Sequence, residues 1–229
     1  MGDFKGVFSY DSKLMTVLNN LADLIFVNLL FIICSIPIVT IGASRAALHK
    51  VASMWMDKDQ AGGREFMKAF WGNLRQATLP WLVMLALGVL LALEAVVLTV
   101  YTIPGQTLLW AVFYLILFVY LLTLTHVTHI PARFESTLKQ TLRSSVLIGL
   151  GNLIPTLPCA VLGAVPFVMF YKWTNTFMEW GLLWIFGFFS LEAAAEAWLL
   201  KKTYARLIDQ VSGKGEAAEE PQEVAATEE

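Results

Sequence analysis

One long apolar run constrains the fold of this chain more than any other feature. It extends from Val17 to Ala43, and Asp23 is the only formally charged side chain within it. A helix of about 20 mainly apolar residues crosses the hydrocarbon core of a bilayer, which is about 30 Å thick. Four further runs of this kind follow, at residues 79–101, 107–130, 145–171 and 180–200. The sequence therefore predicts an all-α fold: a polytopic membrane helical bundle with about five transmembrane helices plus cytoplasmic amphipathic helices.

The composition excludes a soluble globular protein. Hydrophobic residues make up 57% of the 229 residues and charged residues 15%, whereas soluble domains have about 45–50% and 25%. A soluble core of this size could not bury so much apolar surface. We expect a single integral membrane domain over residues 1–211. The remaining segment, 212–229, carries six glutamates and one lysine, and we expect it to form a disordered acidic tail.

The basic residues predict an orientation in the membrane. Thirteen of the sixteen lysines and arginines lie after the first, third and fifth spans, and the other three are Lys5, Lys13 and Lys172. Lysine and arginine accumulate in cytoplasmic loops. We therefore predict a multi-pass protein with its N-terminus outside the cell and its C-terminus in the cytoplasm.

Two basic segments have the spacing of helices that lie along a membrane surface. Residues 64–78 alternate apolar and basic faces at helical intervals, although an extension of the second span fits the same pattern. Residues 134–147 repeat several of these positions at a constant offset. Either a parallel duplication or a chance similarity explains this repeat. The candidate contacts with partner proteins or anionic lipid are Arg64, Lys68, Arg75, Arg133 and Arg143.

Polar side chains inside the predicted spans are candidates for function because each is costly in hydrocarbon. The candidate intramembrane polar site consists of Asp23, Glu94, Glu192 and Asn152. Asp23 and Glu94 are expected in the outer half of the membrane. They either line one external-facing cavity there or form hydrogen bonds between helices.

The last two predicted spans hold further candidates. The fourth span is interrupted by glycines and prolines around Asn152, a pattern found both in the discontinuous helices of transporters and in structural kinks. In the fifth span, Glu192 either pairs with an arginine of the preceding cytoplasmic loop, Arg133 or Arg143, or carries protons during transport. Glu196 lies nearer Lys201, and we expect it to reach the inner interface.

No motif in the sequence predicts catalysis or a cofactor. His126 and His129 are three residues apart, but two ligands are too few for a metal site. His49 lies in the first cytoplasmic loop, and we interpret all three histidines as interfacial polar residues. Ser136 and Lys139 match S-x-x-K without the partner motifs of that hydrolase class. We expect no enzyme activity, no metal and no cofactor.

Several stretches of the chain resemble one bacterial family. They are Tyr10–Ser12, Leu18–Val51 with its Asn28–Leu30, Cys34–Pro37 and Thr40–Ala43 segments, the EFMKAFWGNLRQATLPW helix and Pro131–Glu135. Over residues 1 to about 210 the chain resembles the YesL-like family of bacterial membrane proteins, which has no established activity and therefore no assigned catalytic residues. Its members are frequently encoded beside carbohydrate uptake transporters of the ATP-binding-cassette (ABC) type in Gram-positive bacteria.

The resemblance implies a role in sugar acquisition. The leading hypothesis is a non-enzymatic protein of the bacterial plasma membrane that assists an ABC-type carbohydrate transporter. The alternative is a small permease or channel that uses the broken fourth helix, and the third possibility is a membrane sensor. The expected partners are the lipid bilayer and transporter subunits, without nucleic acid, and the sequence sets no oligomeric state.

Overall fold

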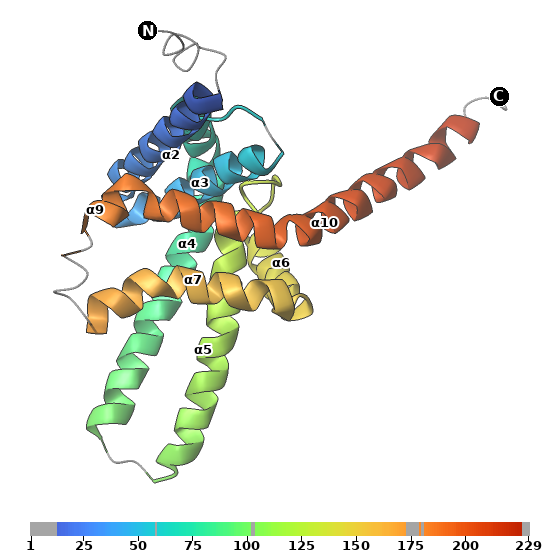
Figure 1. Ribbon diagram of the computed structural model, residues 1–229. Helices are drawn as coiled ribbons and strands as arrows, with labels where there is room; N and C mark the ends of the chain where they lie inside the picture. The colour runs from blue at the N-terminus through green and yellow to red at the C-terminus, as the bar shows by residue number, and fades with distance from the viewer. Residues whose placement is uncertain (1–12, 58, 102–103, 173–178, 180, 226–229) are drawn as a thin grey trace, which may run out of the picture.

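The computed structural model describes residues 13–57, 59–101, 104–172, 179 and 181–225. The chain is all-α over these residues, with no β-strand among them (Figure 1). The elements are α2 (Lys13–Ser35), η1 (Ile38–Thr40), α3 (Ile41–Met56), α4 (Gly63–Val100), α5 (Gln106–His129), α6 (Leu138–Gly151), α7 (Leu153–Lys172), α9 (Gly181–Leu183), η2 (Trp184–Phe188) and α10 (Phe189–Ala225).

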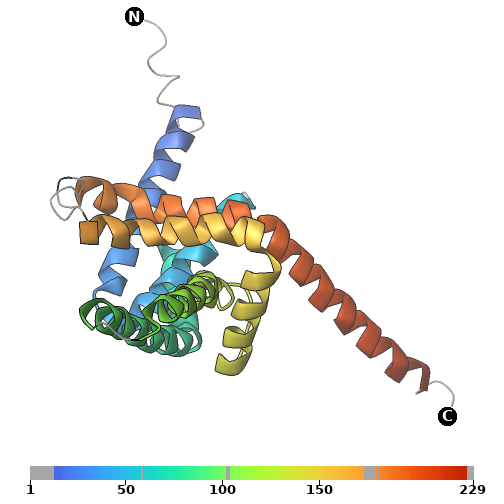
Figure 2. The ribbon, with the colours of Figure 1, turned by 90° about the horizontal axis from the view of Figure 1, so that it is seen from below.

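The helices form a bundle around the short central helix α3. This helix packs against α2, α4, α5 and α10. Its small residues, with Ala43, Ala46, Ala47 and Ala52 fully buried, let the neighbouring backbones approach closely. The α4–α5 hairpin extends away from the rest of the molecule, and α7 and α10 lie side by side across its upper part (Figure 1). Seen from below, α4 and α5 are viewed close to end-on, while α7 and α10 run lengthwise next to each other on one side of them (Figure 2).

The first apolar run does not form one continuous span. α2 ends at Ser35, Pro37 and the 3₁₀ turn η1 reverse the chain, and α3 begins at Ile41. Asp23 of α2 lies beside Gly62, at the start of α4. Further along, the carbonyl of Ile38 accepts a hydrogen bond from Trp81 Nε1 at 2.9 Å. α2 therefore runs in the same direction as α4, and α3 returns. This differs from the single span predicted for 17–43, because proline prevents the helix from continuing through residue 37.

Close packing holds α3 against α4. A Cβ added to Gly42 would lie 2.7 Å from the carbonyl oxygen of Ala77 and closer still to Cβ of Trp81. Only glycine fits there. The start of α4 is fixed by Glu65, whose Oε2 accepts a hydrogen bond from the backbone N–H of Gly62 at 3.0 Å. This carboxylate satisfies one of the amides that a helix N-terminus leaves unpaired.

The segment predicted as the fourth span is broken. α6 and α7 meet at an angle of 111° across Asn152, where glycine and proline residues predict an interruption. Within the described part of the chain, four helices are long and apolar enough to cross a membrane, or five if the bent pair counts as one span. The all-α helical bundle predicted from the sequence is confirmed.

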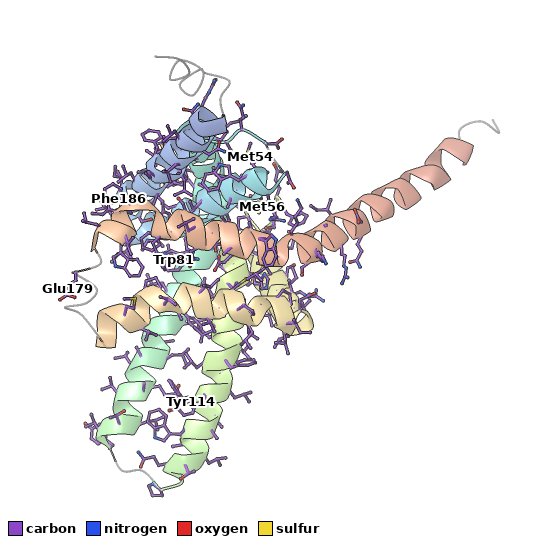
Figure 3. All side chains as sticks on the ribbon, viewed as in Figure 1. Met54, Met56, Trp81, Tyr114, Glu179 and Phe186 are labelled. Carbon is purple, nitrogen blue, oxygen red and sulfur yellow. The ribbon has the colours of Figure 1, made fainter. Side chains whose placement is uncertain are left out.

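Apolar side chains cover the outer surface of these helices. Leu90, Leu93, Val96, Leu108 and Leu115 on the α4–α5 hairpin are each more than half exposed. Figure 3 shows the side chains that project from this hairpin, among them Tyr114 of α5. A soluble monomer rarely exposes so much contiguous apolar surface. The chain is therefore an integral membrane protein whose hairpin is suited to contact with lipid.

The acidic segment that follows residue 211 prolongs α10 as far as Ala225. The sequence predicts disorder for it. Alanine and glutamate, its commonest residues, have high helix propensity, which agrees with a helix in this segment.

Candidate functional site

Five ionisable side chains from three helices meet in the interior of the bundle. α3 contributes Arg45 and His49, α5 contributes His129, and α10 contributes Glu192 and Glu196. Residues four apart on a helix lie on the same face, so α3 and α10 each present two of these groups toward the other. We refer to these five residues as the buried ionisable cluster.

An ion pair holds α3 against α10. Arg45 Nη2 donates to Glu192 Oε1 at 3.0 Å and lies 3.5 Å from Glu196 Oε2. Both carboxylates are almost completely buried, whereas the Arg45 side chain is 21% exposed. Burial opposes the charge of the guanidinium, but the two carboxylates outweigh burial and raise the pKa of Arg45. One guanidinium thus faces two carboxylates.

The second carboxylate lies against two histidines. His129 Nε2 is 3.1 Å from Glu196 Oε2, and His49 Nε2 is 3.6 Å from the same oxygen. The two imidazole rings stack with centroids 3.7 Å apart. Both ring nitrogens of His49 and Nδ1 of His129 are buried without a hydrogen-bond partner. Burial, together with the nearby His129, Arg45 and Arg133, holds the pKa of His49 well below its usual value. No hydrogen bond among the described residues occupies either ring nitrogen of His49.

A separate hydrogen-bond network surrounds His126, one turn before His129 on α5. Its Nε2 is 3.0 Å from Thr156 Oγ1, and its Nδ1 is 2.9 Å from the Tyr204 hydroxyl. Thr156 donates its own hydroxyl proton to the carbonyl of Asn152 at 2.6 Å. Since a hydroxyl has one proton, Thr156 must accept from His126, which assigns the proton to Nε2. Tyr204 then donates to Nδ1, and both nitrogens of His126 are satisfied.

Arg133, in the connection between α5 and α6, contacts this network through Tyr204. Its guanidinium carbon lies 4.5 Å from the centroid of the Tyr204 ring, within the range of a cation–π contact. Burial lowers the pKa of Arg133, although arginine remains charged in proteins. Tyr204 thus contacts His126 through its hydroxyl and Arg133 through its ring.

Asn28 fixes the beginning of α10. Its amide Nδ2 donates to the carbonyls of Trp184 at 2.8 Å and Ile185 at 2.7 Å, and its Oδ1 accepts from the backbone N–H of Ser190 at 3.1 Å. These carbonyls belong to the π-helical turn η2. Such turns leave backbone groups that need other partners, and Asn28 supplies them.

Residues 24–95 match a family model. The family is described as "Protein of unknown function, DUF624". The match supports an uncharacterised family and includes Asn28, Arg45 and His49 of the contacts above. No curated protein matches the chain, and no solved structure matches it.

The four residues predicted to form one intramembrane site are not brought together. Asp23 is exposed beside Gly62. Glu94 lies 31 residues beyond Gly63 on the same helix, or about 46 Å at 1.5 Å per residue. Asn152 ends α6 and its Nδ2 donates to Ile148 O at 3.3 Å. Of the four, Glu192 alone belongs to the cluster, and one cavity lined by both Asp23 and Glu94 is incompatible with this arrangement.

Several expectations for single residues differ from the structure. Glu192 pairs with Arg45 and not with Arg133 or Arg143. Glu196 does not reach the interface, because it is buried against His129. The three histidines are buried and not interfacial, since α3 and the end of α5 are enclosed by neighbouring helices. The signal that could have identified these groups is the four-residue spacing of Arg45 with His49 and of Glu192 with Glu196.

The predicted interfacial cations are mostly exposed. Arg64, Lys68, Arg75 and Arg143 are exposed, whereas Arg133 is partly buried against Tyr204. Arg75 lines a shallow pocket between α4 and the residues that precede α6. Gln76 joins the same two segments, because its Nε2 donates to the carbonyl of Phe134 at 2.6 Å. The exposed cations are available to lipid headgroups or to a partner.

Proposed function

We propose that this chain is a non-catalytic membrane protein of a bacterial plasma membrane that acts as an accessory subunit of an ABC-type carbohydrate transporter. One structural observation supports an accessory role over a transport pathway. Two pairs of buried polar groups in the core, Arg45 with Glu192 and His126 with Tyr204, contact each other across helices. Polar side chains that pair with each other hold their helices together. Polar side chains that bind a transported solute must instead be open to its pathway. The link to carbohydrate uptake rests on the family resemblance.

The α4–α5 hairpin is the surface that we expect to contact the transporter. Its lower half projects beyond the other helices (Figure 1), and its apolar side chains are exposed along both helices. Helices associate in a membrane through close packing of their side chains. A partner's transmembrane helices can therefore pack along this hairpin, and the exposed cations Arg64 and Lys68 can contact an acidic cytoplasmic partner.

We propose that both described ends of the chain face the cytoplasm. The basic residues place the loop around residues 57–62 and the end of α10 there. Because Asp23 lies beside Gly62, the structure favours the N-terminal end of α2 on the same side, which replaces the external N-terminus predicted from the sequence. Lys13 then also follows the positive-inside rule.

Labelling of single cysteines tests this orientation. Cys34 and Cys159 are first replaced by serine, and single cysteines are placed at Lys5, Gln106 and Lys139. In intact cells, a membrane-impermeant thiol reagent should label position 106 and spare positions 5 and 139. Labelling at position 5 would restore the external N-terminus.

Affinity purification from the native membrane tests the accessory role. The tagged chain should recover ABC transporter subunits in mild detergent, and deletion of its gene should reduce carbohydrate uptake. Leu90→Trp and Leu115→Trp on the hairpin should weaken recovery, because lipid accommodates a larger side chain and a packed helix does not. Val161→Trp, at an equally exposed position on α7, is the matched control. Recovery of no transporter subunit together with unchanged uptake would reject the proposal.

A small permease is the second candidate, and the 111° bend between α6 and α7 favours it. Discontinuous helices expose backbone groups that bind solutes in transporters. Reconstituted vesicles test this function. Flux of sugars or ions above that of empty vesicles, reduced by Glu192→Gln, would support a permease. Flux equal to that of empty vesicles would reject it.

A further inference from the structure

We propose that His49, His129 and Glu196 form a binding site for one divalent transition-metal ion. The three side chains come from α3, α5 and α10, and each offers one ligand atom. These three atoms all lie within 4.8 Å of one another, and all three residues are buried. The inference goes beyond the proposed function, because it rests on this cluster alone whatever the partner of the protein is.

The distances from Glu196 to the two histidines are close to those between ligands of one metal ion. In a tetrahedral site with metal–ligand bonds of about 2.0–2.1 Å, neighbouring ligand atoms are about 3.3 Å apart. Glu196 Oε2 lies 3.1 Å from His129 Nε2 and 3.6 Å from His49 Nε2. The second distance is too long for a hydrogen bond. Movements of a few tenths of an ångström would bring both Glu196 pairs to this spacing. The two imidazole rings, which stack with centroids 3.7 Å apart, must also move apart so that both Nε2 atoms point at one ion.

The unpaired nitrogens indicate that the cluster is incomplete. Both nitrogens of His49 and Nδ1 of His129 are buried without a hydrogen-bond partner. A buried polar atom without a partner is costly, and coordination of His49 would satisfy one such atom. Two imidazoles and one carboxylate are a ligand set used for Zn²⁺ and for Fe²⁺, and they leave at least one coordination position for water. The donors thus select a first-row transition ion over Mg²⁺ or Ca²⁺, which prefer oxygen ligands.

The charges of the cluster agree with a bound cation. Arg45 makes its shorter contact with Glu192, at 3.0 Å, and lies 3.5 Å from Glu196. One guanidinium therefore leaves one of two buried carboxylates without a full counterion. An uncompensated buried charge is strongly unfavourable. A metal ion at Glu196 supplies the missing positive charge, and the alternative source is a proton shared between Glu196 and His129.

The chain offers matched residues to separate ligands from neighbours. His126 lies one turn from His129 on α5 and is also buried, but both of its nitrogens are occupied by Thr156 and Tyr204. Glu94 is a carboxylate within another membrane helix, far from the cluster. Substitution of these two residues by glutamine should leave the ion bound. Substitution of His129 or Glu196 by glutamine should remove it.

The experiment counts metal ions on the full-length chain in detergent. The protein carries an affinity tag without histidine, is stripped with a chelator, is dialysed against Zn²⁺ and is analysed by mass spectrometry of the metal. We expect one zinc per chain in the wild type, in His126→Gln and in Glu94→Gln. The dissociation constant should rise at least about a hundredfold in His129→Gln and Glu196→Gln, because even residues that only orient ligands cost ten- to a hundredfold. Circular dichroism confirms that each variant is folded.

Two results would overturn the proposal. One is a wild-type chain that retains less than about one fifth of an equivalent of zinc, which would favour the shared proton. The other is equal zinc content in the wild type and in the Glu196→Gln and His129→Gln variants, which would place the ion elsewhere. The absorption spectrum of Co²⁺ in the wild type gives a second readout that does not depend on the folding of a ligand variant. Intense visible bands of four-coordinate cobalt are expected, and the weak bands of hydrated cobalt would contradict the site.

Discussion

His126 and His129 lie one turn apart on α5, and both are buried, yet their surroundings differ. Both nitrogens of His126 have protein partners, Thr156 on one side and Tyr204 on the other. His129 has one partner, Glu196, and shares it with His49, which has no hydrogen bond to either ring nitrogen. The His126 network satisfies its polar groups with protein partners. In the His49–His129–Glu196 group, three ring nitrogens have no hydrogen-bond partner among the described residues, and one ligand atom of each residue lies within 4.8 Å of the other two.

The contrast separates two roles for buried polar groups in a membrane bundle. A satisfied network stabilises the contact between its helices, and its loss costs folding energy. An unsatisfied group contributes less to folding and is retained at a cost, which is typical of binding sites. The two regions should therefore respond differently to substitution, and the following predictions test this from the largest expected effect to the smallest.

Arg45 should be the most sensitive position, because it is the counterion of two buried carboxylates. Arg45→Met leaves the carboxylates of Glu192 and Glu196 buried without their counterion. We expect the free energy of unfolding in mixed detergent micelles to fall by about 3–5 kcal/mol. Lys201→Met is the matched control, because the Lys201–Asp57 pair at 2.9 Å is mostly exposed and is worth about 0–1 kcal/mol. Equal losses in the two variants would show that burial does not strengthen the Arg45 pair.

Asn28 extends the comparison to a second satisfied group. Asn28→Leu removes three hydrogen bonds to the backbone around η2 and leaves the N–H of Ser190 without its acceptor. Buried groups left unpaired cost about 1–3 kcal/mol each, and we expect a total loss of about 2–3 kcal/mol. Asn20→Leu, at an exposed position two turns earlier on α2, should change stability by less than about 0.5 kcal/mol. A loss confined to the control would contradict the role of Asn28.

Substitution of the two kinds of histidine by phenylalanine compares the regions directly. His126→Phe leaves Thr156 and Tyr204 without their partner and should cost about 1–3 kcal/mol. His49→Phe keeps a flat ring against His129 and breaks no hydrogen bond, so the metal-free protein should lose less than about 1 kcal/mol. Thermal unfolding with and without Zn²⁺ completes the test. Zinc should stabilise the wild type and His126→Phe but not His49→Phe, and the reverse order would reject the distinction.

Gly163 should show the smallest effect. It faces the cluster from α7, and a Cβ there would lie 3.6 Å from Glu192 Oε1 and 3.8 Å from Glu196 Oε1, at ordinary contact distances. Gly163→Ala should retain zinc. It should raise the free energy of unfolding by less than about 1 kcal/mol, because alanine has a higher helix propensity than glycine. Gly72→Ala, where an added Cβ meets no atom within 4 Å, sets the size of that gain. Loss of zinc in Gly163→Ala but not in Gly72→Ala would show that the space beside Gly163 is part of the metal site.

The helical and membrane character of the chain could be predicted because it depends on long runs of one residue type. The apolar runs identify most of the helices of the structure, and the glycines and prolines near Asn152 indicate the break between α6 and α7. The turn at Pro37 was missed because apolar residues continue through it, so hydropathy did not register the reversal. A proline 20 residues into an apolar run was the available signal.

The cluster could not be predicted because it depends on which helices are neighbours. His49 is 80 residues from His129 and 147 from Glu196, and no pattern along the chain relates them. Arg45 and His49 were assigned to a cytoplasmic loop because they are polar and follow an apolar run. The packing of α3 against α4, α5 and α10 encloses them instead. Glu192 was a candidate from the sequence and is buried in the structure, but its partner was sought in a nearer segment of the chain.

X-ray absorption at the zinc edge of the full-length, zinc-loaded chain tests the central claim most directly. The account predicts one ion per chain with two imidazole nitrogens and carboxylate or water oxygens at about 2.0–2.1 Å. The imidazole contribution should fall in His49→Gln and remain in His126→Gln. An ion surrounded by oxygen atoms alone, or a spectrum that is the same in His49→Gln and in the wild type, would contradict the metal site inferred from the buried histidines.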